Sequence, residues 1–172
     1  MNSRGTSRKA QAARPSERVI IFSVGTGTFA IAVNAVQEIR STDSVAGSTE
    51  ELRDAMVPKV RNILRRGRRT YYVVSAGAHF GLPPSPPTLI FLLRDSHTAV
   101  LADAIERMTE LSRLFALPRA FQGEERSWYR GLAVLDGRVI PVVNPAGFLH
   151  RGELAALDAA AARLQAQGVA SE

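Results

Sequence analysis

The sequence contains no cysteine, and this absence excludes several chemistries at once. Without thiols the chain has no disulfides, no thiol catalysis and no thiolate metal sites, so nothing ties it to an oxidising compartment. Long hydrophobic runs are also missing. The apolar runs are short, such as residues 89–93, whereas a membrane-spanning helix needs ~20 residues. We therefore expect a cytoplasmic protein with no direct membrane insertion.

The first 18 residues have no hydrophobic stretch but carry several basic side chains, namely Arg4, Arg8, Lys9, Arg14 and Arg18. A secretory signal peptide needs an apolar segment after its basic residues, and this chain lacks one. The composition is typical of a disordered segment. We assign residues 1–18 to a disordered basic N-terminal arm.

The residue patterns of catalytic, cofactor and metal sites are missing as well. Gly25-Thr26-Gly27 is too short to be a phosphate-binding Walker loop. The three histidines, His79, His97 and His150, lie far apart and share no metal-binding spacing. No serine stands in a G-x-S-x-G nucleophile elbow. We predict that the protein is not an enzyme and holds no cofactor or metal.

The formal net charge is +6, and its clearest source is residues 59–69, which contain six basic side chains and no acid. A basic cluster of this kind has two interpretations. It can keep a strand edge soluble and unpaired, or it can bind nucleic acid through phosphate contacts. Tyr71 and Tyr72 follow the cluster and do not interleave with it as stacking residues would. We favour the solvated edge and keep a nucleic-acid-binding module as the alternative.

The stretch that organises the chain is residues 19–40. Residues 19–22 are apolar and β-branched, and residues 28–33 alternate with the two-residue period of a strand. Gly25-Thr26-Gly27 between them tolerates a tight turn, which predicts a hairpin. Asn34 is a candidate cap for a short helical turn that buries Val36 and Ile39 and presents Glu38 and Arg40.

Further elements follow from local composition. Asp136-Gly137 stands between two apolar runs and predicts a tight hairpin over residues 132–143. Leucines and alanines at helical spacing predict a C-terminal helix from Arg151 to Gln167, ended by Gly168. A short helix is expected over residues 50–56. Residues 102–117 fit a helix by periodicity. Strands are expected at residues 70–74, 88–93 and 98–102.

Two weaker signals concern the arrangement of these elements. The prolines of residues 81–87 exclude a central strand or helix interior, which favours a stiff connector between lobes over a ligand for SH3 or WW modules. Residues 67–73 and 137–143 share Gly-Arg and a final Val at one spacing. This echo is consistent either with two matched lobes or with chance.

The order of these elements resembles the CheW-like domain of bacterial chemotaxis coupling proteins. The opening hairpin, the Val36-x-Glu38-Ile39-Arg40 motif, the Arg66-Gly67 turn and the closing Gly131-Leu132 element carry the resemblance. It implies a mainly β fold of two interlaced five-stranded SH3-like barrels that share a core, with a few short helices. It also implies that residues 102–111 form a strand, against their periodicity. We take residues 19–150 as the CheW-like domain of two lobes and residues 151–172 as a C-terminal helix and tail.

The resemblance also implies a function. Such proteins are non-catalytic signalling adaptors that couple the cytoplasmic tips of chemoreceptors to the regulatory domain of a CheA-type histidine kinase, which recruits them to receptor arrays. Matched residue by residue, the protein-interaction site comprises Val36, Glu38, Arg66 and Gly67. The strand after Gly67 departs from the family pattern, because it lacks the usual Pro and Asp. This departure leaves a CheW-like scaffold with a different protein partner as a further alternative.

Overall fold

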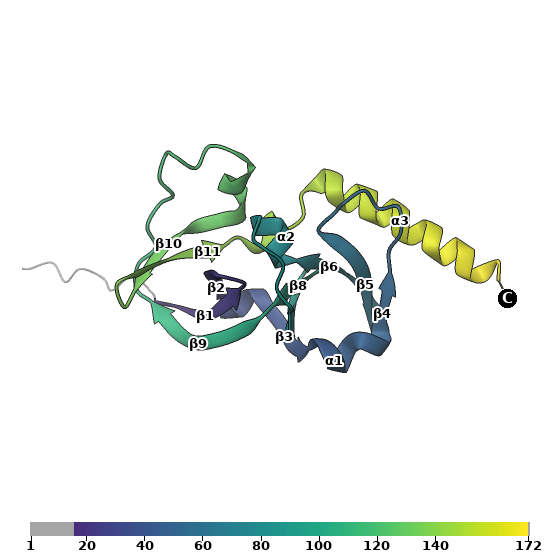
Figure 1. Cartoon of the computed structure of the whole chain (residues 1–172), viewed down its shortest axis with the longest axis horizontal. Helices are drawn as coiled ribbons and strands as arrows, with labels where there is room; N and C mark the ends of the chain where they lie inside the picture. Colours follow the sequence, from purple (N-terminus) through teal and green to yellow (C-terminus); the bar gives the residue numbers. More distant parts are fainter. Residues whose placement is uncertain (1–15, 172) are drawn as a thin grey trace, which may run out of the picture.

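The computed structural model describes residues 16–171, so residues 1–15 of the predicted N-terminal arm lie outside the described residues. Two rolled sheets stand side by side, and a long helix runs along the outer side of one of them (Figure 1). The strands are β1 (Glu17–Val24), β2 (Gly27–Ala32), β3 (Val36–Ser41), β4 (Thr49–Glu51), β5 (Val60–Arg66), β6 (Arg69–Ser75), β7 (Leu89–Leu93), β8 (Thr98–Ala102), β9 (Ala104–Leu111), β10 (Tyr129–Leu135) and β11 (Arg138–Val143).

The helices are few and mostly short. The α-helices are α1 (Thr42–Val45), α2 (Ala76–Phe80) and α3 (Arg151–Val169), and the 3-10 turns are η1 (Val33–Ala35), η2 (Ala46–Ser48), η3 (Glu124–Trp128) and η4 (Pro145–Gly147). None of the helices in residues 16–171 is long and apolar enough to cross a membrane.

The first five strands of the two sheets are connected in the same pattern when lobe 1 is listed from β9 and lobe 2 from β3. Lobe 1 is ordered β9-β1-β2-β11-β10, and lobe 2 is ordered β3-β7-β8-β6-β5-β4. In each lobe an antiparallel hairpin joins a second antiparallel hairpin through one parallel pair, β2 with β11 and β6 with β8. The predicted CheW-like fold of two lobes is confirmed, and lobe 2 has one strand more than expected because β4 pairs with β5.

The central strands, such as β1 and β7, are apolar on both faces because both faces are buried. Inside lobe 1 lies a cluster that includes Val19, Ile21 and Ile140, and inside lobe 2 lies one that includes Leu64, Ile90 and Leu92. The alternate residues, such as Ile20, Phe22 and Phe91, point out of the two sheets into a third cluster, the shared core. The lobes are therefore held together by the outer faces of their sheets.

The repeated strand order explains the echo between residues 67–73 and 137–143. These residues form β6 and β11 together with the turns that precede them, and the two strands hold equivalent places in the two sheets. Each turn contains a glycine with positive φ, 61° at Gly67 and 74° at Gly137. Asp136 also has a positive φ, of 50°, as the predicted Asp-Gly hairpin requires.

Two local expectations are wrong. Residues 50–56 do not form a helix, because Thr49–Glu51 pairs with β5 as a strand. The helical turn expected at residues 36–40 lies earlier, as η1, and Val36–Ser41 pairs with β7. Asn34 sits inside η1 and does not cap it. In both places pairing with a neighbouring strand outweighs the local helical signal.

Two other expectations are confirmed. Residues 104–111 form β9, which pairs with β1, so the strand implied by the family resemblance is correct and the helix favoured by periodicity is not. The C-terminal helix exists as predicted and continues through Gly168 to Val169. Leu157 and Ala160 of α3 are buried in the shared core cluster, and Tyr72 of β6 donates a hydrogen bond to Asp158.

A buried polar cluster fixes the start of α3 to lobe 2. Lys59 lies 3.0 Å from Glu153 of α3 and 3.2 Å from Nδ1 of His79 in α2. The His79 ring is 5 % exposed and packs against Phe80, Trp128 and Phe148. Burial, with a smaller contribution from the Lys59 ammonium, lowers the pKa of His79 to about 3. The imidazole is therefore neutral at physiological pH and accepts a hydrogen bond from Lys59.

The neutral state of His79 predicts a pH-dependent stability. His79 takes up a proton near pH 6.5 in the unfolded chain but resists protonation in the folded chain. Its contribution to the free energy of unfolding is therefore fully present above about pH 6.5. It falls by up to about 1.4 kcal/mol per pH unit as the pH drops toward 3. Urea denaturation between pH 7 and pH 4 measures this slope. His79→Gln keeps an acceptor for Lys59 and should flatten the slope, whereas His97→Gln, at an exposed turn, should not.

A second prediction concerns Gly131 on β10. A Cβ atom at this position would stand 2.4 Å from the backbone oxygen of Phe115, which pairs with Leu132 through two hydrogen bonds of 2.8 and 2.9 Å. Gly131→Ala should therefore lower the free energy of unfolding by about 1–3 kcal/mol in urea denaturation. The control is Gly47→Ala, because no atom lies within 4 Å of a Cβ there. Equal stability of the two variants would contradict the prediction.

Candidate protein-interaction site

Glu38 and Arg40 lie on the same face of β3, which is the first strand of lobe 2. In the pairing of β3 with β7, Glu38 stands opposite Leu92 and Arg40 stands opposite Ile90, and both of these β7 residues belong to the interior cluster of lobe 2. Glu38 and Arg40 therefore point toward the inside of the rolled sheet. Their side chains remain 30 % and 36 % exposed, so they sit at its open end.

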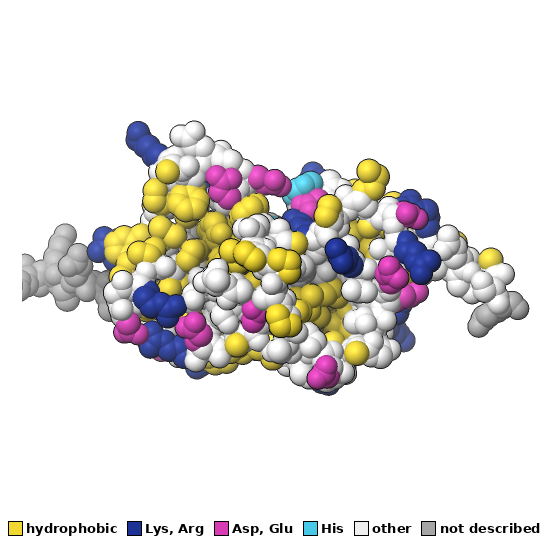
Figure 2. Space-filling view, in the orientation of Figure 1, with side chains coloured by type: hydrophobic (Ala, Val, Ile, Leu, Met, Phe, Trp, Pro, Cys, Tyr) yellow, Lys and Arg dark blue, Asp and Glu magenta, His cyan; other side chains and the backbone are white. Residues whose placement is uncertain are grey.

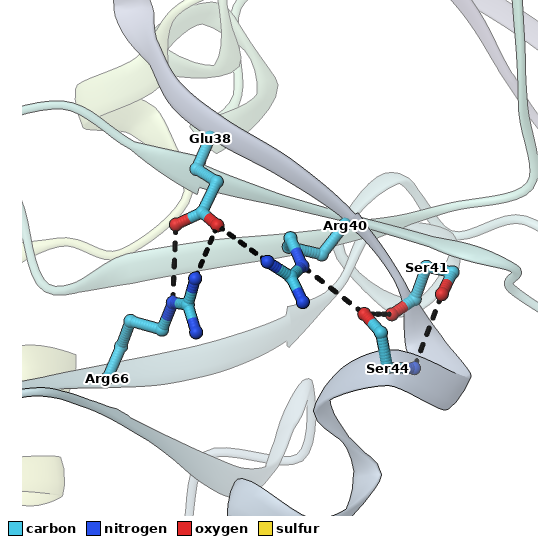
Figure 3. A network of polar contacts seen from close by, with 5 residues as sticks. All are labelled: Glu38, Arg40, Ser41, Ser44 and Arg66. Carbon is cyan, nitrogen blue, oxygen red and sulfur yellow. Dashed lines mark hydrogen bonds and ion pairs between the residues drawn. The ribbon is translucent and has the colours of Figure 1, made fainter.

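Arg66 reaches Glu38 from the other side of this opening. It is the last residue of β5, and three strands separate β5 from β3 in the sheet. The Arg66 guanidinium donates two hydrogen bonds to the carboxylate, one of 2.7 Å from Nη2 to Oε1 and one of 3.3 Å from Nε to Oε2 (Figure 3). This bidentate ion pair spans the mouth of the lobe 2 barrel.

Arg40 extends the network to α1. Its Nη1 lies 3.2 Å from Oε1 of Glu38, and its Nε donates to Oγ of Ser44 at 3.3 Å. Ser44 is held in turn by Ser41, whose hydroxyl accepts the Ser44 backbone N–H at the start of α1 (Figure 3). The charged side chains at the mouth are thus fixed by neighbours on three elements, β3, β5 and α1.

The charges of this network do not balance. Two guanidinium groups face one carboxylate, so Glu38, Arg40 and Arg66 together carry +2 − 1 = +1. The hydrogen bond from Arg66 lowers the pKa of Glu38, and the bond to Glu38 raises the pKa of Arg66. Both groups are therefore fully charged at neutral pH. The mouth presents an ordered polar surface with an excess of positive charge.

The other two predicted site residues have different positions. Val36 is 8 % exposed and belongs to the shared core, so it anchors β3 more than it offers an apolar surface. Gly67 lies in the exposed turn directly after Arg66, and the space within 4 Å of a Cβ there is empty. The structure thus brings Glu38 and Arg66 into contact, places Gly67 beside them and buries Val36 below them.

Lobe 1 carries a similar ion pair of opposite polarity. Arg107 of β9 lies 2.5 Å from Asp136, which precedes Gly137 as Arg66 precedes Gly67. β9 and β3 hold equivalent places in the two sheets. The basic residue of the pair comes from β9 in lobe 1, whereas the acidic residue comes from β3 in lobe 2. The sequence analysis missed this pair, although the repeated Gly-Arg pattern at Gly67 and Gly137 pointed to the position of Asp136. It named Arg40 as an exposed residue but did not include it in the site.

The basic cluster of residues 59–69 is partly neutralised by ion pairs. Lys59 pairs with Glu153, Arg65 with Glu50 at 3.3 Å, and Arg66 with Glu38. The acids come from α3, β4 and β3, so the neutralisation depends on the tertiary fold. Three of the six basic side chains are thus engaged with acids of the same chain.

One group of side chains in residues 16–171 has the makeup of a metal site. Glu124, His150 and Glu153 each offer a ligand atom, and these atoms lie within 4.8 Å of one another. The Lys59 ammonium already forms an ion pair with the Glu153 carboxylate. His150 caps α3, because its Nδ1 accepts a hydrogen bond from the Glu153 backbone N–H. These side chains have structural roles, and a cation here would compete with Lys59 for Glu153.

Comparison with known proteins agrees with this architecture. The CheW-like domain family matches residues 18–153. The crystal structure of the scaffolding protein TtCheW from Thermoanaerobacter tengcongensis matches with a TM-score of 0.66 and 13 % sequence identity, over 76 % of this chain and 90 % of that chain. No curated protein matches the sequence.

The family match covers both lobes and the start of α3, so it includes all of the strands described above apart from Glu17, the first residue of β1. The strand order, the shared core and the fold of TtCheW agree with it. The family consists of non-catalytic scaffolding adaptors, which confirms the prediction that the protein is not an enzyme. The chain belongs to the CheW-like domain family.

Proposed function

We propose that this protein is a signalling adaptor that couples the cytoplasmic tip of a chemoreceptor to the regulatory domain of a CheA-type histidine kinase. We further propose that it acts in the cytoplasm, where it is recruited to receptor arrays. The match to the CheW-like domain family over residues 18–153 is the observation that carries this proposal. The interaction site is the mouth of lobe 2, with Glu38, Arg66 and Gly67 at the surface and Val36 beneath them.

The geometry of the mouth is suited to recognising a protein surface. The ion pair of Arg66 and Glu38 is preorganised, so a partner does not have to order these side chains when it binds. The excess positive charge favours a partner that brings a carboxylate to the exposed edge of Arg40 or Arg66. Charged groups at such a surface fix the orientation of the partner and raise the association rate more than they add raw affinity.

The domain division follows from the same proposal. The proposed division takes residues 19–150 as the two-lobed adaptor domain and residues 151–172 as the C-terminal helix and tail. Of the basic arm predicted for residues 1–18, Glu17 and Arg18 instead begin β1 and pair with Leu111 and Glu110 of β9. The start of α3 at Arg151 supports the second boundary, and the Lys59–Glu153 ion pair holds the helix against the domain.

Charge reversal tests the proposed site. Glu38→Arg and Arg66→Glu should each weaken co-purification with the kinase or receptor partner by about tenfold or more, because each brings like charges together at the mouth. The pair is partly exposed, so the midpoint of thermal unfolding should change little. The control is Arg65→Glu, which has the same charge change one residue earlier on the opposite face of β5 and should bind like wild type.

The double variant Glu38→Arg/Arg66→Glu separates an interface role from a structural one. It restores an ion pair across the mouth with its polarity reversed, so its thermal stability, like that of the single variants, should stay close to the wild-type value. If the mouth recognises a partner, binding should remain weak in the double variant. Wild-type binding in the double variant, or in both single variants, would overturn the site assignment. Strong salt-dependent binding of labelled DNA or RNA would instead support the nucleic-acid alternative.

A further inference from the structure

A cavity of about 400 Å³ lies beside the turn of the β1–β2 hairpin, where Val24 lines it. The start of β5, α2, the proline segment of residues 82–87 and the end of β8 surround it. Figure 2 shows a hollow with hydrophobic side chains in its floor on this face of the molecule, below α2. The volume falls within the range of small-molecule sites, roughly 300–1,000 Å³. The floor is formed by Val24, Val73, Ala76, Leu82 and Leu101.

Several polar residues of the cavity wall are already engaged within the chain. Lys59 contacts Glu153 and His79, and Asp103 accepts the backbone N–H of Gly25 at 2.6 Å. The hydroxyl of Ser75 accepts the backbone N–H of Ala78 at the start of α2. These residues build the wall and have little capacity left for a ligand.

Three other wall residues have side chains without a hydrogen bond or ion pair to any residue of the described chain, namely Arg61, Asn62 and Ser85. The β-bulge between Val60 and Asn62 allows the consecutive residues Arg61 and Asn62 to line the same cavity. A guanidinium, an amide and a hydroxyl thus border an apolar floor. Each of the three groups can donate hydrogen bonds to one acceptor.

We propose that this cavity binds a small organic monocarboxylate with an aliphatic body of several carbons. The guanidinium of Arg61 and the amide of Asn62 match the two oxygens of a carboxylate, and the apolar floor takes the aliphatic part. The carboxylate of Asp103, which also lines the cavity, disfavours a ligand with two or more negative charges. This site is separate from the mouth of lobe 2 and does not depend on the proposed adaptor function.

Hexanoate, 1-hexanol and acetate are the probes that test the site. Hexanoate carries both the anion and the chain, hexanol lacks the anion, and acetate lacks the chain. In a titration of the isotope-labelled full chain followed by amide chemical shifts, hexanoate should move the signals of Arg61, Asn62, Gly77 and Ala78. Its affinity should exceed those of hexanol and acetate by about tenfold or more.

Two variants and one matched control complete the experiment. Arg61→Gln should lower the hexanoate affinity about tenfold. Gly77→Leu should abolish binding, because a Cβ at Gly77 would point toward Val24 and Ser75, 3.8 and 3.9 Å away, so a longer side chain enters the cavity. Arg68→Gln removes the same charge in the β5–β6 turn outside the cavity and should leave the affinity within about twofold.

The proposal is overturned if hexanoate moves none of the four amide signals, or if acetate or inorganic phosphate binds as tightly as hexanoate. It is also overturned if Arg61→Gln binds hexanoate like wild type. Partner binding by the charge-reversal variants of Glu38 and Arg66 is a separate measurement, so either proposal can fail without the other.

Discussion

The structure depends on one constraint, the burial of the central strands of two rolled sheets on both of their faces. Along β1, Val19 and Ile21 enter the interior of lobe 1, whereas Ile20, Phe22 and Val24 enter the shared core. A strand placed in this way cannot alternate between apolar and polar residues, and it reads as a continuous apolar run. The same is true of β7 in lobe 2, where every residue is apolar. Separating the two lobes would expose the apolar outer faces of β1 and β7 to water.

Polar groups are excluded from the central strands such as β1 and β7, and they lie on the outer strands and where the sheets end. The mouth of lobe 2 carries Glu38, Arg40 and Arg66, and lobe 1 carries Arg107 and Asp136 at the equivalent place. Each pair joins an outer strand of its sheet to a hairpin turn that a glycine makes possible. The repeated strand order thus produces two similar charged ends, and the side chains give them opposite polarity. A binding partner can therefore tell the two lobes apart by their charges although their folds are alike.

The remaining surface has further regions of distinct chemistry. Hydrophobic side chains gather over the β10–β11 hairpin and the segment before it, where Val134 and Val139 are 52 % and 64 % exposed (Figure 2). The cavity beside α2 has donors on one wall and an apolar floor, and it lies away from the mouth of lobe 2. The anchoring of α3 through Lys59, His79 and Glu153 connects that cavity wall to the C-terminal helix. The proposed adaptor contacts and the proposed ligand site therefore involve different residues.

By itself the sequence determined the features that depend on neighbouring residues. The hairpins at Gly25 and Asp136-Gly137 follow from residues that tolerate positive φ, and α3 follows from leucines and alanines at helical spacing. The resemblance carried by residues 36–40 and by Arg66-Gly67 identified the fold and four residues of the proposed site. Only the tertiary structure decided which distant strands meet. It turned residues 49–51 into β4 and residues 36–41 into β3, against their local helical signals, because pairing with β5 and β7 satisfies their backbone groups. It also joined Glu38 to Arg66 across 28 residues, since that contact depends on how the sheet rolls and no local pattern encodes it.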